Sequence, residues 1–297
     1  MTTNGAIKTV TTTVNYDILG PDEIYKIATA SLYQNRPCDT KSVTVSDIRP
    51  HSSGFTLDGQ GFELHKHNID FHDFSDNDKV ESEWWPAVAD FLKSKTGATK
   101  AIPFSHLIRN QPYSAAEEAS KNADPDQSVT VLNPARWVHI DQSRDGALIL
   151  LKDVLKDSWL QLSKTRWGII NVWRPISPVV RKDPLGFVDG STVDPDDLVP
   201  KDVKYPVARK NVSTTTSGAV VHRVCGVKSS PKHKWYYVNE MSNEEVLLIK
   251  IFDSKEDGRV REVPHTSFVD EEWENEKENR ESIETRCLVF WEDQDAE

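Results

Sequence analysis

Apolar residues recur at helical spacing in two segments of the first hundred residues of this 297-residue chain. Residues 21–32 place apolar side chains three and four positions apart behind an acidic start, which predicts a helix. Residues 79–98 show the same period over a longer stretch and end in Gly97, a residue typical of helix C-termini. The pattern therefore predicts two amphipathic helices in this portion of the chain.

Strand-type alternation lies between these two predicted helices. Residues 42–50 alternate β-branched and polar side chains, which predicts a strand. Residues 52–71 predict a pair of strands that turns at Asp58 and Gly59. The first hundred residues are therefore expected to mix helices with strands.

Beyond residue 100 the period of two dominates, in short runs separated by Pro, Gly, Asn or Asp. The predicted strands lie within residues 101–109, 135–143, 166–175, 185–193, 234–240, 245–254, 263–270 and 284–292. One helix is predicted among them, over residues 144–162. We therefore expect an α+β, mainly β protein with a double-stranded β-helix (jelly-roll) core and N-terminal and buttressing helices. The expected organisation is one domain, with a mixed portion over residues 1–100 and the jelly roll over residues 101–297.

Composition and charge narrow the classes of partner. The net charge of −11 disfavours nucleic-acid binding, which needs a basic surface to replace counterions. The sequence contains no run of 18 apolar residues, so no membrane span is predicted. The Thr-rich N-terminus lacks the apolar segment of a signal peptide. Three widely spaced cysteines offer neither a disulfide framework nor a zinc motif. We expect a cytoplasmic protein with a small-molecule partner, and a homodimer remains an open alternative.

The run RWVHIDQS, residues 136–143, places two metal-type ligands on one face of a predicted strand. His139 and Asp141 are two positions apart, so their side chains point to the same side of a strand. Such a pair occurs often by chance, and on its own an ordinary polar strand face explains it better. A third ligand distinguishes the two interpretations, and VPHTSF supplies His265 in another strand-like context. Two histidines and one carboxylate form the facial triad that holds non-haem Fe(II) and leaves positions open.

A pair of residues later in the chain suits a co-substrate at such a site. Arg280 and Ser282 in RES are again two positions apart, and a guanidinium with a hydroxyl can bind a carboxylate. The open positions of a facial triad suit a bidentate 2-oxo acid and O2. The pair therefore predicts an anchor for the remote carboxylate of 2-oxoglutarate.

The order His-x-Asp, distant His and Arg-x-Ser resembles the Fe(II)/2-oxoglutarate-dependent oxygenases. The segments VHIDQS, IINVWRPI, HKWYYVNEMSNEEVLLIKIFDS and PHTSFVD followed by RESIETRCLVF are similar to one branch of that family. This branch includes gibberellin-desaturase-like proteins and the cephamycin methoxylation component, and the similarity covers roughly residues 71–290. It implies iron, 2-oxoglutarate and O2, with a small natural-product substrate that is hydroxylated, desaturated, cyclised or peroxidised.

Four further residues are candidates for substrate contact. These are Arg109, Asn171, Trp173 and Tyr237. Each has an ordinary alternative, because a strand also carries core aromatics and surface arginines. They are therefore expected near the pocket only if their strand faces turn toward the triad.

A rival metal site and two rival functions remain open at this point. The run HKHNIDFHDF holds His65, His67, Asp70 and His72, although a solvated surface strand explains it better. The same His-Asp-His triad would also suit a zinc hydrolase or a cupin-type isomerase. A non-catalytic jelly-roll binding module is the third class. The Arg280–Ser282 pair favours the oxygenase, since neither rival function requires it.

Overall fold

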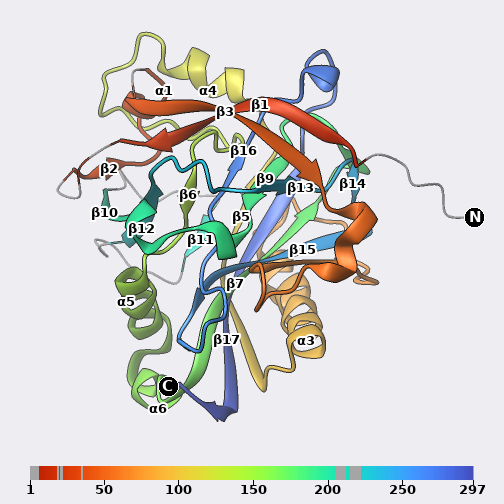
Figure 1. Ribbon diagram of the computed structural model, residues 1–297, viewed down its shortest axis with the longest axis vertical. Helices are drawn as coiled ribbons and strands as arrows, with labels where there is room; N and C mark the ends of the chain where they lie inside the picture. The colour runs from red at the N-terminus through yellow and green to blue at the C-terminus, as the bar shows by residue number, and fades with distance from the viewer. Residues whose placement is uncertain are drawn as a thin grey trace, which may run out of the picture.

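Two β-sheets that face each other form the core in the computed structural model (Figure 1). The structure describes residues 7–18, 20, 23–34, 36–204, 212–214 and 222–296. Within these residues, nine strands form the larger sheet, in the order β1 (Thr9–Asp17), β3 (Cys38–Asp47), β13 (Trp235–Tyr237), β9 (Leu185–Val188), β16 (His265–Ser267), β6 (His139–Ile140), β12 (His222–Val227), β10 (Leu198–Lys204) and β2 (Tyr25–Lys26).

The smaller sheet and a short strand pair complete the β structure. Six strands of the described chain form the smaller sheet, in the order β11 (Val212–Thr214), β5 (Lys100–Arg109), β17 (Ser282–Asp295), β7 (Thr165–Pro175), β15 (Glu245–Asp253) and β4 (Phe62–Lys66). Two short strands pair separately, β14 (Met241–Ser242) with β8 (Val179–Val180). The mainly β jelly-roll core expected from the sequence is confirmed.

Helices cover the outside of the sheets. The α-helices are α1 (Ser31–Gln34), α2 (Asn77–Lys79), α3 (Trp85–Thr96), α4 (Tyr113–Ser120), α5 (Arg144–Leu155) and α6 (Trp159–Leu162). The π-helical turn η2 (Val80–Trp84) joins α2 to α3, and the 3₁₀ turns are η1 (Arg49–Gly54), η3 (Lys156–Ser158), η4 (Gly190–Thr192), η5 (Pro195–Asp197) and η6 (Glu271–Trp273). None of the described helices combines the length and the hydropathy that crossing a membrane requires.

Alternation along β7 and β17 separates the two faces of the smaller sheet. On β7, Ile170 and Val172 belong to an outer cluster that packs against η2 and α3, whereas Ile169 and Trp173 belong to the core between the sheets. The indole of Trp84 is fully buried in the outer cluster, and its Nε1–H donates to Thr285 at 2.8 Å. Burial of such a side chain stabilises the fold by roughly 3 kcal/mol. Helix α3 therefore closes the outer face and leaves the inner face for the site.

Two predicted helices differ from the structure. Instead of a helix over residues 21–32, the described part of this segment contains β2 and the single turn of α1, with Ala28 at φ 61° between them. Tyr25 pairs in parallel with Val203 of β10, so strand pairing and a left-handed residue override the helical period. The predicted helix over residues 144–162 is likewise broken, because Lys156 adopts φ 50° at the end of α5.

The predicted strand pair at Asp58 is also wrong, since only its second arm forms a strand. This strand, β4, pairs with β15 and not with the residues before the turn. The Asp58 carboxylate accepts hydrogen bonds from Lys250 at 2.8 Å and Arg166 at 3.1 Å. Both cations also bond to buried Asp253, so the turn is anchored to the smaller sheet. Compensating buried charges in this way is more favourable than leaving either cation unpaired.

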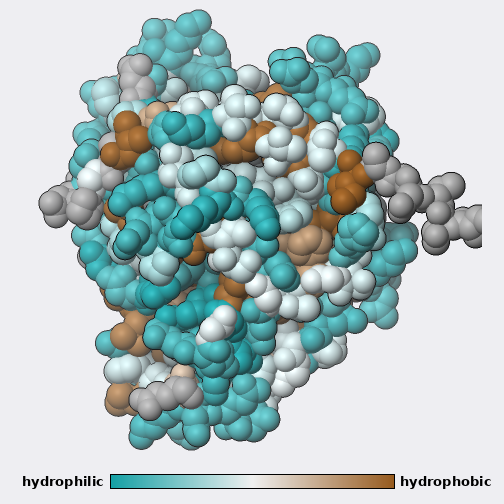
Figure 2. Space-filling view, viewed as in Figure 1, coloured by the Kyte–Doolittle hydropathy of each residue, from teal (hydrophilic) through white to brown (hydrophobic). Residues whose placement is uncertain are grey.

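The face of the molecule that carries β1, β3 and α5 is predominantly polar. Figure 2 shows hydrophilic residues over most of this face and apolar residues in small, separate patches. Such scattered apolar residues are ordinary on protein surfaces. This view therefore gives no reason to place a docking surface on this face.

Candidate metal centre and co-substrate site

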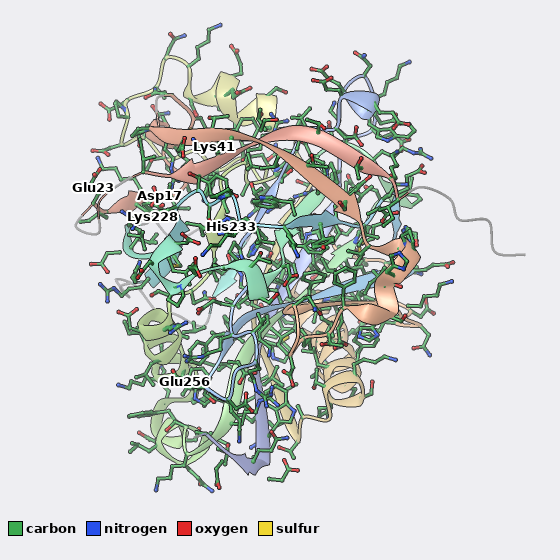
Figure 3. The ribbon with its side chains drawn as sticks, viewed as in Figure 1. Asp17, Glu23, Lys41, Lys228, His233 and Glu256 are labelled. Atoms are coloured by element: carbon green, nitrogen blue, oxygen red, sulfur yellow. The ribbon has the colours of Figure 1, made fainter. Side chains whose placement is uncertain are left out.

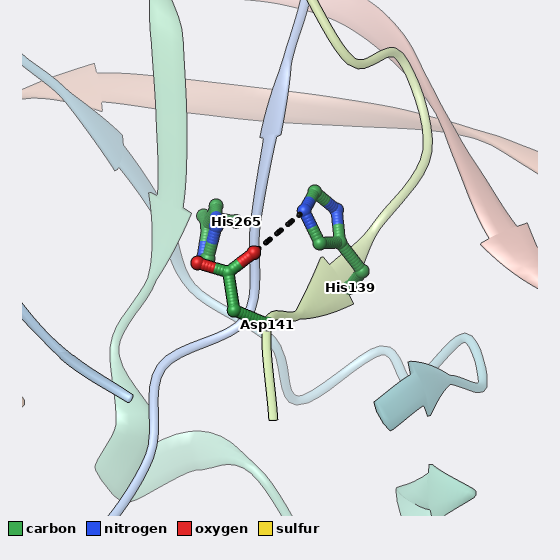
Figure 4. Close-up of side chains that lie close together, drawn as sticks. All are labelled: His139, Asp141 and His265. Atoms are coloured by element: carbon green, nitrogen blue, oxygen red, sulfur yellow. Dashed lines mark ion pairs between the residues drawn. The ribbon is translucent and has the colours of Figure 1, made fainter. Parts of the chain in front are cut away.

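His139, Asp141 and His265 converge on one point between the sheets (Figure 4). One ligand atom of each side chain lies within 4.8 Å of the others, and His139 Nε2 is 3.7 Å from Asp141 Oδ1. His265 lies directly opposite His139 where β16 pairs with β6. Directly opposed residues of an antiparallel pair project to the same face, which brings the two imidazole rings to 4.6 Å between centroids. The convergence expected from the sequence therefore occurs.

Local structure beside β6 fixes the position of Asp141. The predicted strand over residues 135–143 is shorter in the structure, because β6 contains only His139 and Ile140. Ser143 then begins α5 as its N-cap and accepts a hydrogen bond from the Gly146 amide. Asp141 thus lies in the short bend between a strand and a capped helix.

Both histidines direct Nε2 at the same point. The Nδ1–H of His139 donates to the Trp137 carbonyl at 2.8 Å, and that of His265 donates to the Val263 carbonyl at 3.1 Å. A carbonyl only accepts hydrogen bonds, so each ring carries a proton on Nδ1, and the neutral ring then has its lone pair on Nε2. His265 Nε2 is buried without a hydrogen-bond partner among the described residues. A buried lone pair of this kind fits a metal ligand.

The ionisation states of His139 and Asp141 also suit a metal. Burial and the neighbouring His265 lower the pKa of His139 to about 3, which keeps its ring neutral. Burial would raise the pKa of Asp141, but the charge of Arg286 and the hydrogen bond from Asn171 hold this pKa well below its usual range. Neutral imidazoles and an ionised carboxylate are the forms that bind metals.

Acidification should destabilise the metal-free protein through His139. Its pKa is about 3 in the folded chain and near 6.5 when unfolded, so only the unfolded state takes up a proton between these values. Stability is therefore retained above about pH 6.5 and lost as the pH falls, by up to about 1.4 kcal/mol per pH unit. Thermal melting of His139→Asn between pH 7 and 4.5 should show a shallower pH dependence than the wild type. Parallel curves would contradict this assignment.

Arg280 and Ser282 are buried where β17 begins. They are 3% and 1% exposed, and Ser282 lies opposite Arg109 on β5. Arg280 Nη1 donates to the Asp183 carbonyl at 2.6 Å, and its guanidinium lies 5.5 Å from the Trp173 ring centroid. Burial and the nearby Arg109 lower the pKa of Arg280 to about 9, and its Nε has no hydrogen-bond partner among the described residues. A buried guanidinium in this state suits a carboxylate ligand.

The four substrate candidates have different environments. Trp173 lies beside Arg280. Arg109 lies on β5 directly opposite Ser282, and its guanidinium donates to the Asn133 carbonyl. Asn171 contacts the triad itself, because its Nδ2–H donates to Asp141 at 2.6 Å. Tyr236 pairs with Phe187, which in turn pairs with His265, so Tyr236 shares the face of the sheet that carries the triad. Its neighbour Tyr237 therefore points to the opposite face, where it packs against Phe268. The geometry therefore brings three of the four toward the site.

The rival histidine cluster does not converge. His65 bonds to Glu63, His67 bonds to the Asn243 carbonyl and His72 bonds to Asp70 at the surface. Among the described residues, the one group with metal-ligand geometry is that of His139, Asp141 and His265. The expected surface location of the rival cluster is consistent with these contacts.

Sequence reasoning missed Glu284 and Arg286, which continue the polar face of β17. The two are two positions apart, as are Arg280 and Ser282, so four successive inward positions in RESIETR are polar. Arg286 bonds to Glu284 and to Asp141. The alternation of polar residues is therefore visible in the sequence, but the contact between Arg286 and Asp141 is not.

A separate groove of about 640 Å³ lies away from the triad, between β3 and the segment before β13. Its lining includes Lys41 from β3 and His233, both labelled in Figure 3. His233 bonds to Tyr16 through Nδ1 at 3.0 Å and to Asp197 through Nε2 at 3.1 Å. Both ring nitrogens are thus used inside the protein, and no ligand chemistry follows from this groove.

A jelly roll with two histidines and a carboxylate converging between its sheets defines a metal-dependent enzyme class. A family model described as "Oxidoreductase/YMDC permease-like domain" matches residues 15–290. The chain is 40% identical over 260 residues to the hydroxylase/desaturase efuI of Hormonema carpetanum, covering 87% of this chain and 86% of that protein. It is 32% identical to the alpha-ketoglutarate-dependent dioxygenase phiK of a fungal species, covering 87% of each.

A solved structure shows the same architecture. The iron and alpha-ketoglutarate-dependent endoperoxidase NvfI superposes with a TM-score of 0.74 at 26% identity, over 96% of this chain and 98% of that one. The chain therefore belongs to the family of Fe(II)/2-oxoglutarate-dependent oxygenases that includes these fungal hydroxylases and desaturases. The family expected from the sequence motifs is confirmed, and the chain is an oxidoreductase that depends on iron and 2-oxoglutarate.

Proposed function

We propose that His139, Asp141 and His265 bind Fe(II), and that Arg280 and Ser282 bind the remote carboxylate of 2-oxoglutarate. The observation that carries this proposal is the convergence of two Nε2 lone pairs with one ionised carboxylate. Three protein ligands leave positions for the co-substrate and O2. When bound, iron supports decarboxylation of 2-oxoglutarate by O2 to succinate and CO2, coupled to two-electron oxidation of a substrate.

The protein's own residues would then position the reactants. The triad nitrogens and carboxylate fix the metal between the sheets, and Arg280 sets the direction from which 2-oxoglutarate approaches it. Arg109 and Trp173 lie next to Arg280 and are proposed to border the substrate. Similarity to the hydroxylase/desaturase efuI and the dioxygenase phiK supports a small natural-product intermediate as the substrate. Hydroxylation, desaturation, cyclisation and peroxidation all remain compatible with it.

Anaerobic addition of Fe(II) followed by 2-oxoglutarate tests this assignment. We expect a weak visible charge-transfer band that needs both additions, because it would arise only when Fe(II) and the 2-oxo acid are bound together. Succinate should then form on admission of O2. Tight zinc binding without the band would instead support a hydrolase or isomerase, and absence of metal binding would support a binding module.

A further inference from the structure

The smaller sheet holds both oxygens of the Asp141 carboxylate, although the triad itself comes from the larger sheet. Asn171 Nδ2–H donates to Asp141 Oδ2 at 2.6 Å, and Arg286 Nη2–H donates to Oδ1 at 3.3 Å. Asn171 is fully buried, and the Arg286 side chain is 18% exposed. The carboxylate therefore has a donor on each side before any metal is considered.

Strand register places the two donors next to each other on one face of the smaller sheet. Asn171 on β7 and Arg286 on β17 are directly opposite each other, so both project to the same inner face. Glu284, two positions before Arg286 on that face, bonds to the guanidinium at 2.8 Å. The ion pair neutralises Arg286, so the donors bring no net positive charge toward a bound cation.

Backbone placement alone leaves the Asp141 carboxylate able to turn. The terminal torsion of an aspartate is broad and roughly two-fold, unlike the staggered torsions of aliphatic side chains. Asp141 also lies just beyond β6, in the bend before α5. Outside contacts are therefore required to fix the plane of this carboxylate.

We propose that Asn171 and Arg286 form a carboxylate clamp, which positions Asp141 for metal binding. The proposal rests on the function proposed above and assigns Asn171 to the metal ligand in place of the substrate. Groups that orient a metal ligand commonly contribute about ten- to hundredfold to metal affinity. Loss of the clamp should therefore weaken metal binding even when all three ligands remain.

Titration of the metal-free full-length protein with Co(II) tests the clamp without turnover. Asn171→Leu removes the donor at similar volume, and Arg286→Met/Glu284→Gln removes both charges together. Each is expected to raise the Co(II) dissociation constant about ten- to hundredfold and to change the visible absorption of the bound Co(II). Thr285→Val is the matched control, because Thr285 lies between Glu284 and Arg286 but faces Trp84. It should lower the melting temperature and leave the dissociation constant within about twofold of the wild type.

The outcomes separate the two proposals. If the wild type binds no Co(II), the proposed metal site is wrong and the clamp with it. If the wild type binds Co(II) and both clamp variants bind it with the same dissociation constant as the wild type, the clamp alone is wrong. Equal weakening by Thr285→Val would also overturn it, since general loosening of β17 would then explain the effect.

Discussion

Asp141→Ala should abolish succinate formation, with a loss of more than about a thousandfold relative to the wild type. The substitution removes the single anionic ligand of the proposed triad and leaves two neutral nitrogens to hold a divalent cation. It also leaves Asn171 and Arg286, the two donors to Asp141, without this acceptor. Product analysis by mass spectrometry with saturating Fe(II), 2-oxoglutarate and O2 measures the loss.

A surface carboxylate provides the control for this substitution. Asp194 forms an exposed ion pair with Lys232, and Asp194→Asn should retain activity within about twofold. Succinate formation by Asp141→Ala at a rate near that of the wild type would show that iron is bound elsewhere.

Arg280→Met should raise the KM for 2-oxoglutarate by about a hundredfold or more. Removing one member of a buried, hydrogen-bonded charge pair costs about 2–5 kcal/mol, most of it from the unpaired partner. The methionine keeps the apolar stem beside Trp173 but cannot donate to a carboxylate. The KM of Arg280→Lys for 2-oxoglutarate should lie between those of the wild type and Arg280→Met, because lysine keeps the charge and loses the bidentate fork.

Affinity for the metal separates this effect from damage to the triad. Co(II) binding by Arg280→Met is expected to match the wild type, since Arg280 bonds to the Asp183 carbonyl rather than to a ligand of the triad. Arg181→Met is the matched control, because Arg181 is half-exposed and pairs with Glu240. An unchanged KM in Arg280→Met would place the 2-oxoglutarate anchor on another residue.

The triad could be predicted from the sequence because two of its three residues are close together in the chain. The alternation rule placed His139 and Asp141 on one side, and the later His265 needed only the same sheet. The contacts of Asn171 and Arg286 could not be predicted in the same way. They depend on β17 inserting next to β7 and on a register that sets these two residues opposite each other, which is determined by tertiary packing.

Errors in the predicted elements have a related cause. Residues 21–32 have a helical period, yet Tyr25 gains more from pairing with β10 than from an isolated turn of helix. Local residues alone predict the turn at Asp58, although distant cations determine where its carboxylate lies. Strand parity likewise decides where Tyr237 points, because Tyr236, and not Tyr237, aligns through Phe187 with His265.

Assembly of the site from both sheets has a consequence for folding. Asp141 and Arg286 are 145 residues apart in the chain, so their contact closes only after the sheets dock. A partly folded chain would lack the assembled metal site. A cation that binds the native state alone stabilises it by mass action, by about 2.7 kcal/mol at a hundredfold excess over its Kd. The supply of iron would then determine both the activity of the protein and its resistance to proteolysis.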